Sequence, residues 1–292
     1  MTSKQCRLCK EEKYIVCSHI FPKFIIKRHL DTSVTGKFRT SLHPNKPVQD
    51  GLKLPLFCEE CEHIFSIFEK KVSEKFYTNF INIPSKEHPY ENWLLKFAVS
   101  ISFRTLLLMK TKGLANFSNE RKNLNKALDN WRNFLHAEKE LDTQYEHHII
   151  PLSIISRRNN EPLHPNFNTY LMRCLAFDMV KTSDKKNLFI FSKMGPLLIL
   201  GFIKNTDSSQ WKGTKITEEQ GYLKGPFTIP KNLLDFLIIG AEKFRSSASI
   251  ISENQRNRIE KSYIKNSEKM PTSETLEALN RDIKLFGSSA FL

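Results

Sequence analysis

The sequence predicts an α+β protein in which a small N-terminal zinc module is attached to a larger body of helices and antiparallel strands. Two CxxC pairs lie near the N-terminus, and segments with helical spacing of apolar residues alternate with apolar runs typical of strands. The chain has 292 residues, of which 40% are hydrophobic and 22 are phenylalanine. This is enough to fill the core of one large domain or of two modest ones.

The cysteine module covers residues 1–83. Its two pairs are Cys6 with Cys9 and Cys58 with Cys61. Two such pairs provide four thiolates in a tetrahedron, which is typical of structural zinc because no position is left open for water or substrate. Because paired CxxC motifs in a reducing compartment indicate metal rather than disulfides, we expect Zn²⁺ to stabilise the fold here.

The remaining sequence of the module predicts short strands and one helix. We expect strand-like pieces at residues 14–16 and 19–21, a loop containing Gly36 and Gly51, and the second cysteine pair. From Glu62 onwards, apolar residues at three- and four-residue spacing predict a helix: Phe65, Phe68, Val72 and Phe76. Pro84 and Pro89 mark its end.

The body covers residues 84–292. Residues 91–141 are predicted to be helical, residues 148–204 to contain strands (148–156 and 168–204), and residues 231–286 to be helical again. Two apolar runs on either side of residues 193–196 predict a β-hairpin. Within the last region we expect helices at 233–245, 253–265 and 273–285, with Ser273 as N-cap and Gly287 just past the end.

Charge and hydropathy limit the classes of function. The formal net charge is +14, and residues 1–50 carry ten lysines and arginines against four acids. Such an excess favours polyanions, although a solvated basic surface explains it as well. The longest apolar run, near residues 194–203, is interrupted by glycine and proline, and the N-terminus has no apolar signal core. We therefore expect a cytoplasmic protein without a membrane partner.

Between the cysteine pairs lies CSHIFPKF, residues 17–24, and the second pair, LFCEEC, leads directly into HIFSIFEKK. In this order and spacing, residues 6–76 resemble the HNH endonucleases. The resemblance implies a treble-clef or ββα-metal finger with a structural zinc site. It also implies a bacterial enzyme that hydrolyses phosphodiester bonds of DNA, in phage defence or in a mobile element.

The resemblance assigns roles to individual residues. His19 matches the general base that activates water, and a catalytic Mg²⁺ or Mn²⁺ would be bound near that strand and on the following helix. The family has His or Asn directly after the last cysteine, where this chain has Glu62, and Lys53 stands where the family has its Asn. Glu62 and Glu69 lie at i and i+7, on one polar stripe of the helix, and are therefore candidate metal ligands. They could equally be solvated acids near a helix N-terminus.

Two further features bear on function. The basic residues between the cysteine pairs are candidates for nucleic-acid binding: Lys23, Lys27, Arg28, Lys37 and Arg39. The segment EHHIIPL, residues 146–152, is similar to the His-containing motif but has no cysteine knuckle after it. We interpret it as a strand entering a proline turn, with a role for His147 or His148 in a second site as the alternative.

Two functions follow. The first is a metal-dependent HNH-like endonuclease with DNA as partner, in which the body from about residue 91 recognises substrate, regulates the cut or contacts a protein. The second is a degenerate zinc-binding module that binds nucleic acid or protein without cleaving it.

Overall fold

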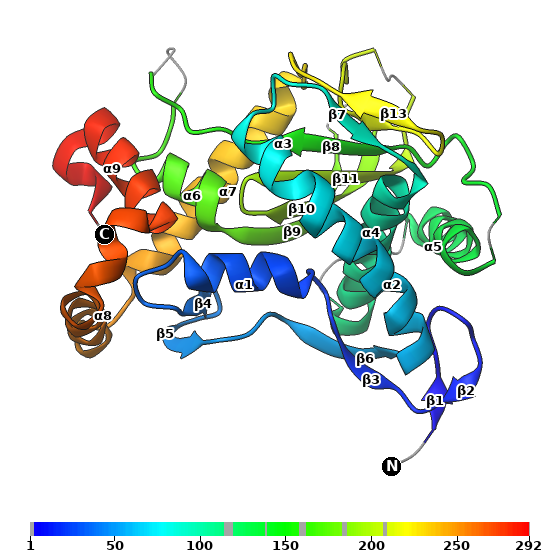
Figure 1. Cartoon of the computed structure of the whole chain (residues 1–292), viewed down its shortest axis with the longest axis horizontal. Coiled ribbons are helices and arrows are strands. Elements are labelled where there is room, and N and C mark those ends of the chain that lie inside the picture. Colours follow the sequence, from blue (N-terminus) through cyan, green and yellow to red (C-terminus); the bar gives the residue numbers. More distant parts are fainter. Residues whose placement is uncertain are drawn as a thin grey trace.

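The computed structural model describes residues 3–113, 119–137, 139–157, 162–182, 186–206 and 209–291. Its centre is a five-stranded antiparallel sheet with the order β12-β8-β11-β10-β9 (Figure 1). The strands are β8 (His147–Pro151), β9 (Leu175–Lys181), β10 (Leu188–Met194), β11 (Leu197–Lys204) and β12 (Lys215–Ile216). The predicted hairpin is confirmed: β10 pairs with β11, and Gly195 in the turn between them has a φ of 61°.

Helices cover both faces of this sheet. Helix α4 (Asn92–Lys112) packs on β8, β10 and β11, and α5 (Arg121–His136) packs beside it. Helices α6 (Phe167–Arg173) and α7 (Lys231–Ser249) share a second apolar cluster with the opposite face. Because side chains alternate along a strand, Ile190 joins the α4 cluster while the next residue, Phe191, joins the α7 cluster. This explains why nearly every side chain of β10 and β11 is buried.

The N-terminal part is built from short elements. The strands are β1 (Lys4–Gln5) and β2 (Glu12–Lys13), which pair with each other, and β3 (Val16–His19) and β6 (Lys53–Phe57), which form a second pair. Between β3 and β6 lie α1 (Lys23–Asp31) and the hairpin of β4 (Phe38–Thr40) and β5 (His43–Val48). Helix α2 (Glu59–Lys71) follows β6 and continues through a π-helical segment (Val72–Tyr77) into α3 (Thr78–Asn82).

The remaining elements close the molecule. Strand β7 (His88–Tyr90) pairs with β13 (Gly221–Leu223). Helix α8 (Glu253–Lys265) has the bounds that the sequence predicts, and a 3-10 turn (Ser267–Thr272) connects it to α9 (Glu274–Phe286) and a last turn (Gly287–Ala290). Ser273 is the N-cap of α9, since its Oγ accepts a hydrogen bond from the Leu276 amide, and Gly287 ends that helix.

The α+β class is confirmed, but several element predictions need correction. The strand pieces expected at residues 14–16 and 19–21 are replaced by one strand, β3, and the expected loop contains α1 and the β4–β5 hairpin. Residues 167–173 form helix α6 and not the start of a strand. The buried carboxylate of Asp282, on α9, accepts the backbone N–H groups of Asn168 and Thr169 and so caps the start of α6. The predicted helical region 91–141 contains two helices, α4 and α5, and its residues 114–118 and 138 lie outside the described part of the chain.

A buried lysine joins the hairpin to α6. Lys193 Nζ donates to the backbone carbonyls of Tyr170, Leu171, Cys174 and Gly195 at 2.7–3.1 Å. Three of these carbonyls belong to the last turn and C-cap of α6, where most carbonyls have no intrahelical partner. Burial lowers the pKa of Lys193 to about 7. The lysine therefore serves as the C-terminal cap of α6, and it is not available to solvent.

One hydrophobic cluster joins the N-terminal module to the body. It contains Cys6, Phe65 and Phe76 from the module together with Phe103 and Trp131 from α4 and α5. Helix α4 is long and apolar enough to cross a membrane by length and composition, but 83% of the relevant window is buried inside the protein. This burial is the environment of a core helix, not of a segment facing lipid.

Candidate metal centre and histidine site

The four predicted cysteines meet at one point. Cys6 and Cys9 lie in the turn between β1 and β2, Cys58 precedes α2, and Cys61 lies in its first turn. Their Sγ atoms all lie within 4.8 Å of one another, and Cys9 Sγ is 3.9 Å from Cys58 Sγ. A tetrahedral site with Zn–S bonds of ~2.3 Å places its sulfurs about 3.8 Å apart. The cluster is thus compatible with a structural metal.

The local backbone shapes this cluster. The Lys10 amide donates to the Cys6 carbonyl at 3.0 Å, and Lys10 has a φ of 69°, so the chain turns sharply after Cys9. Burial raises the pKa of the Cys61 thiol, and burial likewise raises that of Cys58 to about 11. Because a cation favours the thiolate, metal binding here would release protons.

His19 lies at the end of β3, opposite Lys53 of β6. Its side chain is 18% exposed, and its Nε2 lies 2.8 Å from Asp50 Oδ1. The other oxygen, Asp50 Oδ2, lies 2.5 Å from Lys53 Nζ. Lys53 and then His19 hold the pKa of Asp50 well below its usual range, so the carboxylate is ionised at neutral pH. His19 thus has an anionic partner that the sequence analysis missed.

Gly51 allows the Asp50 turn to approach His19. A Cβ at Gly51 would lie 2.9 Å from two carbons of Ile26 and 3.4 Å from His19 Cδ2. The Asp50 carboxylate also accepts the Gly51 amide at 2.7 Å. Aspartate followed by glycine is typical of chain reversals, and this is the sequence feature that identifies the bend between β5 and β6.

A buried arginine connects His19 with helix α2. Arg104, on α4, is 1% exposed. Its Nη1 donates to the His19 backbone carbonyl at 3.0 Å, its Nη2 lies 2.8 Å from Glu69 Oε1, and its guanidinium lies over the ring of Phe65. In the sequence, Arg104 is the only charged residue between Lys96 and Lys110, in the apolar middle of α4, and this isolation is the signal that could have revealed it.

The structure distinguishes the two candidate carboxylates. Glu69 already has a cationic partner, Arg104. Glu62 has a buried Oε1 without a hydrogen-bond partner among the described residues. An unpaired carboxylate oxygen fits a hard cation, whereas a carboxylate that is bound to a guanidinium fits one less well. A small hollow lies beside Glu69, lined by Phe24, Ser66, Glu69, Lys70, Ser73 and Glu74.

The five candidate nucleic-acid residues have different surroundings. Lys23 and Lys37 are exposed, and Lys27 pairs with Asp31. Arg28 Nη2 lies 2.7 Å from Glu274 Oε1, on α9, and its guanidinium lies over the ring of Tyr77. Arg39 is half-buried, and burial lowers its pKa.

The second histidine motif forms a buried strand, as predicted. His147 and His148 lie in β8 and are 0% exposed. His147 Nδ1 contacts the Tyr145 carbonyl at 3.0 Å, and His148 Nδ1 contacts Thr214 Oγ1 at 2.8 Å. Burial lowers the pKa of His147 to about 3, so the ring is neutral at physiological pH.

Comparison of the chain with protein-family models, with curated proteins and with solved structures gives no match.

Proposed function

We propose that this chain is a metal-dependent endonuclease of the HNH type that hydrolyses phosphodiester bonds of DNA. The observation that carries the proposal is the contact between His19 Nε2 and Asp50 Oδ1 at 2.8 Å. His19 ends β3, which pairs with β6, and β6 leads into α2, the helix that begins at the second cysteine pair. The proposal is also supported by a cysteine turn, a β-pair and a helix that begins at the second cysteine pair, which is the order of elements expected for a treble clef.

The contact with Asp50 sets the role of the imidazole. When Nε2–H donates to the ionised carboxylate, Nδ1 keeps its lone pair and is the basic nitrogen. Nδ1 can then take a proton from water while the water oxygen forms a bond to phosphorus. The bond from phosphorus to the leaving sugar oxygen breaks, and that oxygen takes a proton from solvent. Asp50 holds the imidazole and stabilises the imidazolium that forms.

A divalent cation would be held by Glu62, whose Oε1 lacks a partner among the described residues. When bound, such an ion stabilises negative charge on the phosphate and on the leaving oxygen. Glu69 acts differently in this proposal, because its bond to Arg104 fixes α2 against the strand end that carries His19.

The second candidate function is a module that binds DNA without cleaving it. It is favoured by two observations: Glu69 is committed to Arg104, and Lys53, where the family has an Asn, is committed to Asp50. Each contact pairs a carboxylate, that of Glu69 or that of Asp50, with a cation, although a catalytic metal site would otherwise use such a carboxylate.

Cleavage of supercoiled plasmid with Mg²⁺ or Mn²⁺ tests the proposal. We expect nicked and linear products from the wild type and from His43→Ala, an exposed histidine of the same module. We expect His19→Ala to be at least ~100-fold slower, as for the loss of a general base. All three proteins should have the same unfolding temperature.

Two results would contradict the enzyme. Wild-type protein that retains plasmid in a gel shift without cutting it, with either metal, would support the binding module. Cleavage of equal rate in His19→Ala would place any activity elsewhere.

A further inference from the structure

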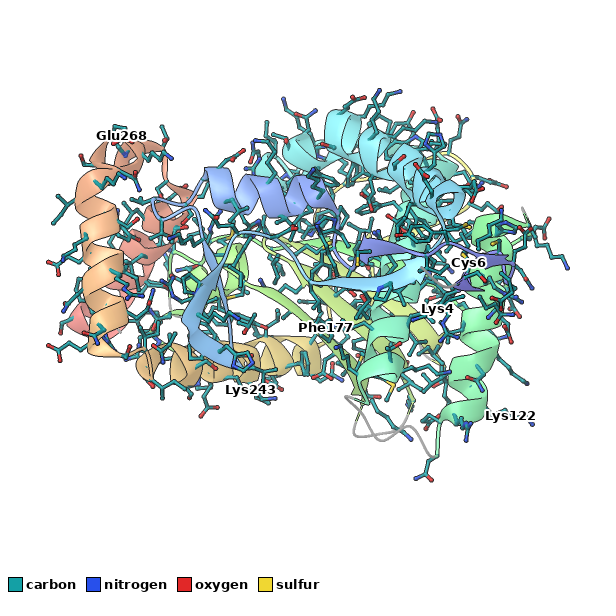
Figure 2. The ribbon with its side chains drawn as sticks, turned by 90° about the horizontal axis from the view of Figure 1, so that it is seen from below. Lys4, Cys6, Lys122, Phe177, Lys243 and Glu268 are labelled. Carbon is teal, nitrogen blue, oxygen red and sulfur yellow. The ribbon has the colours of Figure 1, made fainter. Side chains whose placement is uncertain are left out.

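A group of cations surrounds the first cysteine turn on the side away from the C-terminal helices. Arg7 and Lys10 lie in the turn between β1 and β2, Lys110 is in the last turn of α4, and Arg121 and Arg132 lie on α5. We call these five residues the knuckle face. Figure 2 shows Cys6 of this turn and Lys122 of α5 on the same side of the molecule.

Helices α4 and α5 pack against each other, and the cysteine turn lies close enough for its charges to act on Lys110 of α4. The pKa of Lys110 is lowered, mainly by burial and also by the positive charges of Arg121, Arg7 and Lys10. Lys10, in the cysteine turn, is near enough to α5 for the charge of Arg132 to act on it. Lys110 Nζ is held to α5 by Asn125 Oδ1 at 2.5 Å. Segments far apart in the sequence therefore bring like charges together.

The internal acids do not balance this group. Asp129, which acts on both lysines, pairs with Arg132 at 3.4 Å. Two other acids near the turn, Glu11 and Glu60, pair with Lys13, which is not one of the five cations. A zinc-loaded site of four thiolates adds about two net negative charges beneath the turn. Five cations still exceed these three charges, and exposed Lys112, Lys122 and Lys126 on the same helices add to the excess. Such a surplus attracts an external polyanion.

The form of the surface favours a double helix over a single strand. Arg121 and Arg132 lie eleven residues apart on one rigid helix, or about 17 Å, and duplex DNA carries one charge per ~1.7 Å of its axis. Single-strand binders add aromatic rings on which bases stack. The exposed aromatic side chains of the described residues are Tyr14, Tyr222 and Phe291, and none lies on the β1–β2 turn, α4 or α5.

We propose that the knuckle face docks the phosphate backbone of double-stranded DNA. This inference deepens the proposed function and rests on it for the choice of DNA as the polyanion. Strand β3 runs from Val16, opposite Phe57 at the cysteine end, to His19, which is about 10 Å along the strand. That distance is shorter than one turn of duplex, ~34 Å, so a duplex that ran from the knuckle face in the direction of β3 would be long enough to reach the histidine site.

Fluorescence anisotropy with a labelled duplex of about three helical turns tests the surface, over a series of salt concentrations and without added divalent metal. The test variant is the triple substitution Arg7→Gln, Lys110→Gln and Arg121→Gln. The matched control, Lys231→Gln, Lys243→Gln and Lys265→Gln, removes the same charge from exposed positions of α7 and α8.

We expect the test variant to bind about 10- to 100-fold more weakly near 0.1 M salt, and its slope of log K against log salt to be smaller by about 3. The control should keep the wild-type slope. Equal losses in both variants, no loss in the test variant, or tighter binding of the unpaired strand than of the duplex would each overturn the proposal.

The plasmid assay separates this inference from the proposed function. Duplex binding that depends on the knuckle face, without cleavage, leaves the inference standing and removes the enzyme. Cleavage that depends on His19, with duplex binding unaffected by the test variant, does the reverse.

Discussion

Arg104 Nη1 donates a hydrogen bond to the backbone carbonyl of His19 at 3.0 Å. The same guanidinium binds Glu69 of α2 and lies over Phe65, so one buried cation joins β3, α2 and the core helix α4. The position of His19 is therefore set by a residue 85 positions away in the chain. The candidate site depends on the packing of the body as well as on the cysteine cluster.

Loss of Arg104 should destabilise the whole protein. In Arg104→Met, the half-buried Glu69 carboxylate loses its partner and the His19 carbonyl loses its donor. We expect the free energy of unfolding to fall by about 3 kcal/mol, as for breaking a buried pair. Urea denaturation measures this loss. Arg258→Met, at an exposed position of α8, should change the stability by less than about 0.5 kcal/mol, and a loss in Arg104→Met no larger than this would contradict the prediction.

The cysteine cluster should bind about one equivalent of metal, and removing the metal should lower the unfolding temperature. The double variant Cys58→Ser and Cys61→Ser loses half of the thiolates and should lose the metal. Elemental analysis and thermal unfolding measure both effects. Cys17→Ser is the control, because Cys17 is exposed and lies outside the cluster. Unchanged metal content in the double variant would refute the site.

Much of the fold could be predicted from local patterns. Helix α8, the Ser273 cap and the β10–β11 hairpin depend on periodicity, capping and turn residues within a few positions of one another. The cysteine cluster could be predicted because the spacing of each pair encodes its geometry.

Contacts over long sequence distances could not be predicted. Helix α6 begins where the Asp282 carboxylate, 114 residues away, accepts its N–H groups. Glu69 and Arg28 have the pattern of solvated surface charges, yet their partners, Arg104 and Glu274, come from other helices. A sequence pattern identifies which residues are polar, but the packing of distant helices decides which polar residues meet.

Stability should fall as the pH decreases below about 6.5, because two buried histidines stay neutral in the folded state. Burial lowers the pKa of His29 to about 3, with Arg173 as the next cause, and burial lowers that of His147 to about 3. In the unfolded chain each of these histidines takes up a proton near pH 6.5, whereas in the folded state each does so only near pH 3. Between these two pH values the extra protons stabilise the unfolded state progressively. From pH 6.5 to about 5, each histidine should cost about 2 kcal/mol.

Urea denaturation at several pH values checks this effect. His147→Asn keeps a donor for the Tyr145 carbonyl but does not titrate, so its stability should depend less on pH than that of the wild type. His136→Asn, at an exposed position, should behave as the wild type does. An identical pH dependence in His147→Asn and the wild type would contradict the prediction.

Asp50 should affect cleavage more than binding, if the proposed function holds. In Asp50→Asn the imidazole loses its anionic partner, so both its orientation and the stabilisation of the imidazolium are weakened. Because Asp50 is 52% exposed, we expect the cleavage rate to fall by a moderate factor, about 10- to 100-fold, with duplex affinity unchanged. Asp31→Asn, which breaks the exposed pair with Lys27, is the control. Equal cleavage by the two variants would remove Asp50 from the site.

Glu274 should hold the C-terminal helices against α1. Its Oε1 lies 2.7 Å from Arg28 Nη2, and its Oε2 lies 2.8 Å from Arg173 Nη1. Glu274→Gln leaves two arginines without their anion, so we expect a loss of about 2 kcal/mol in stability and faster hydrogen exchange of the amides of α9. Glu277→Gln, at an exposed position of the same helix, should leave exchange unchanged. Equal exchange in the two variants would contradict the prediction. Two other contacts of α9 would then be sufficient to hold it in place: the hydrogen bond from Ser273 Oγ to the Thr32 carbonyl, and the one from the Asn168 amide to Asp282.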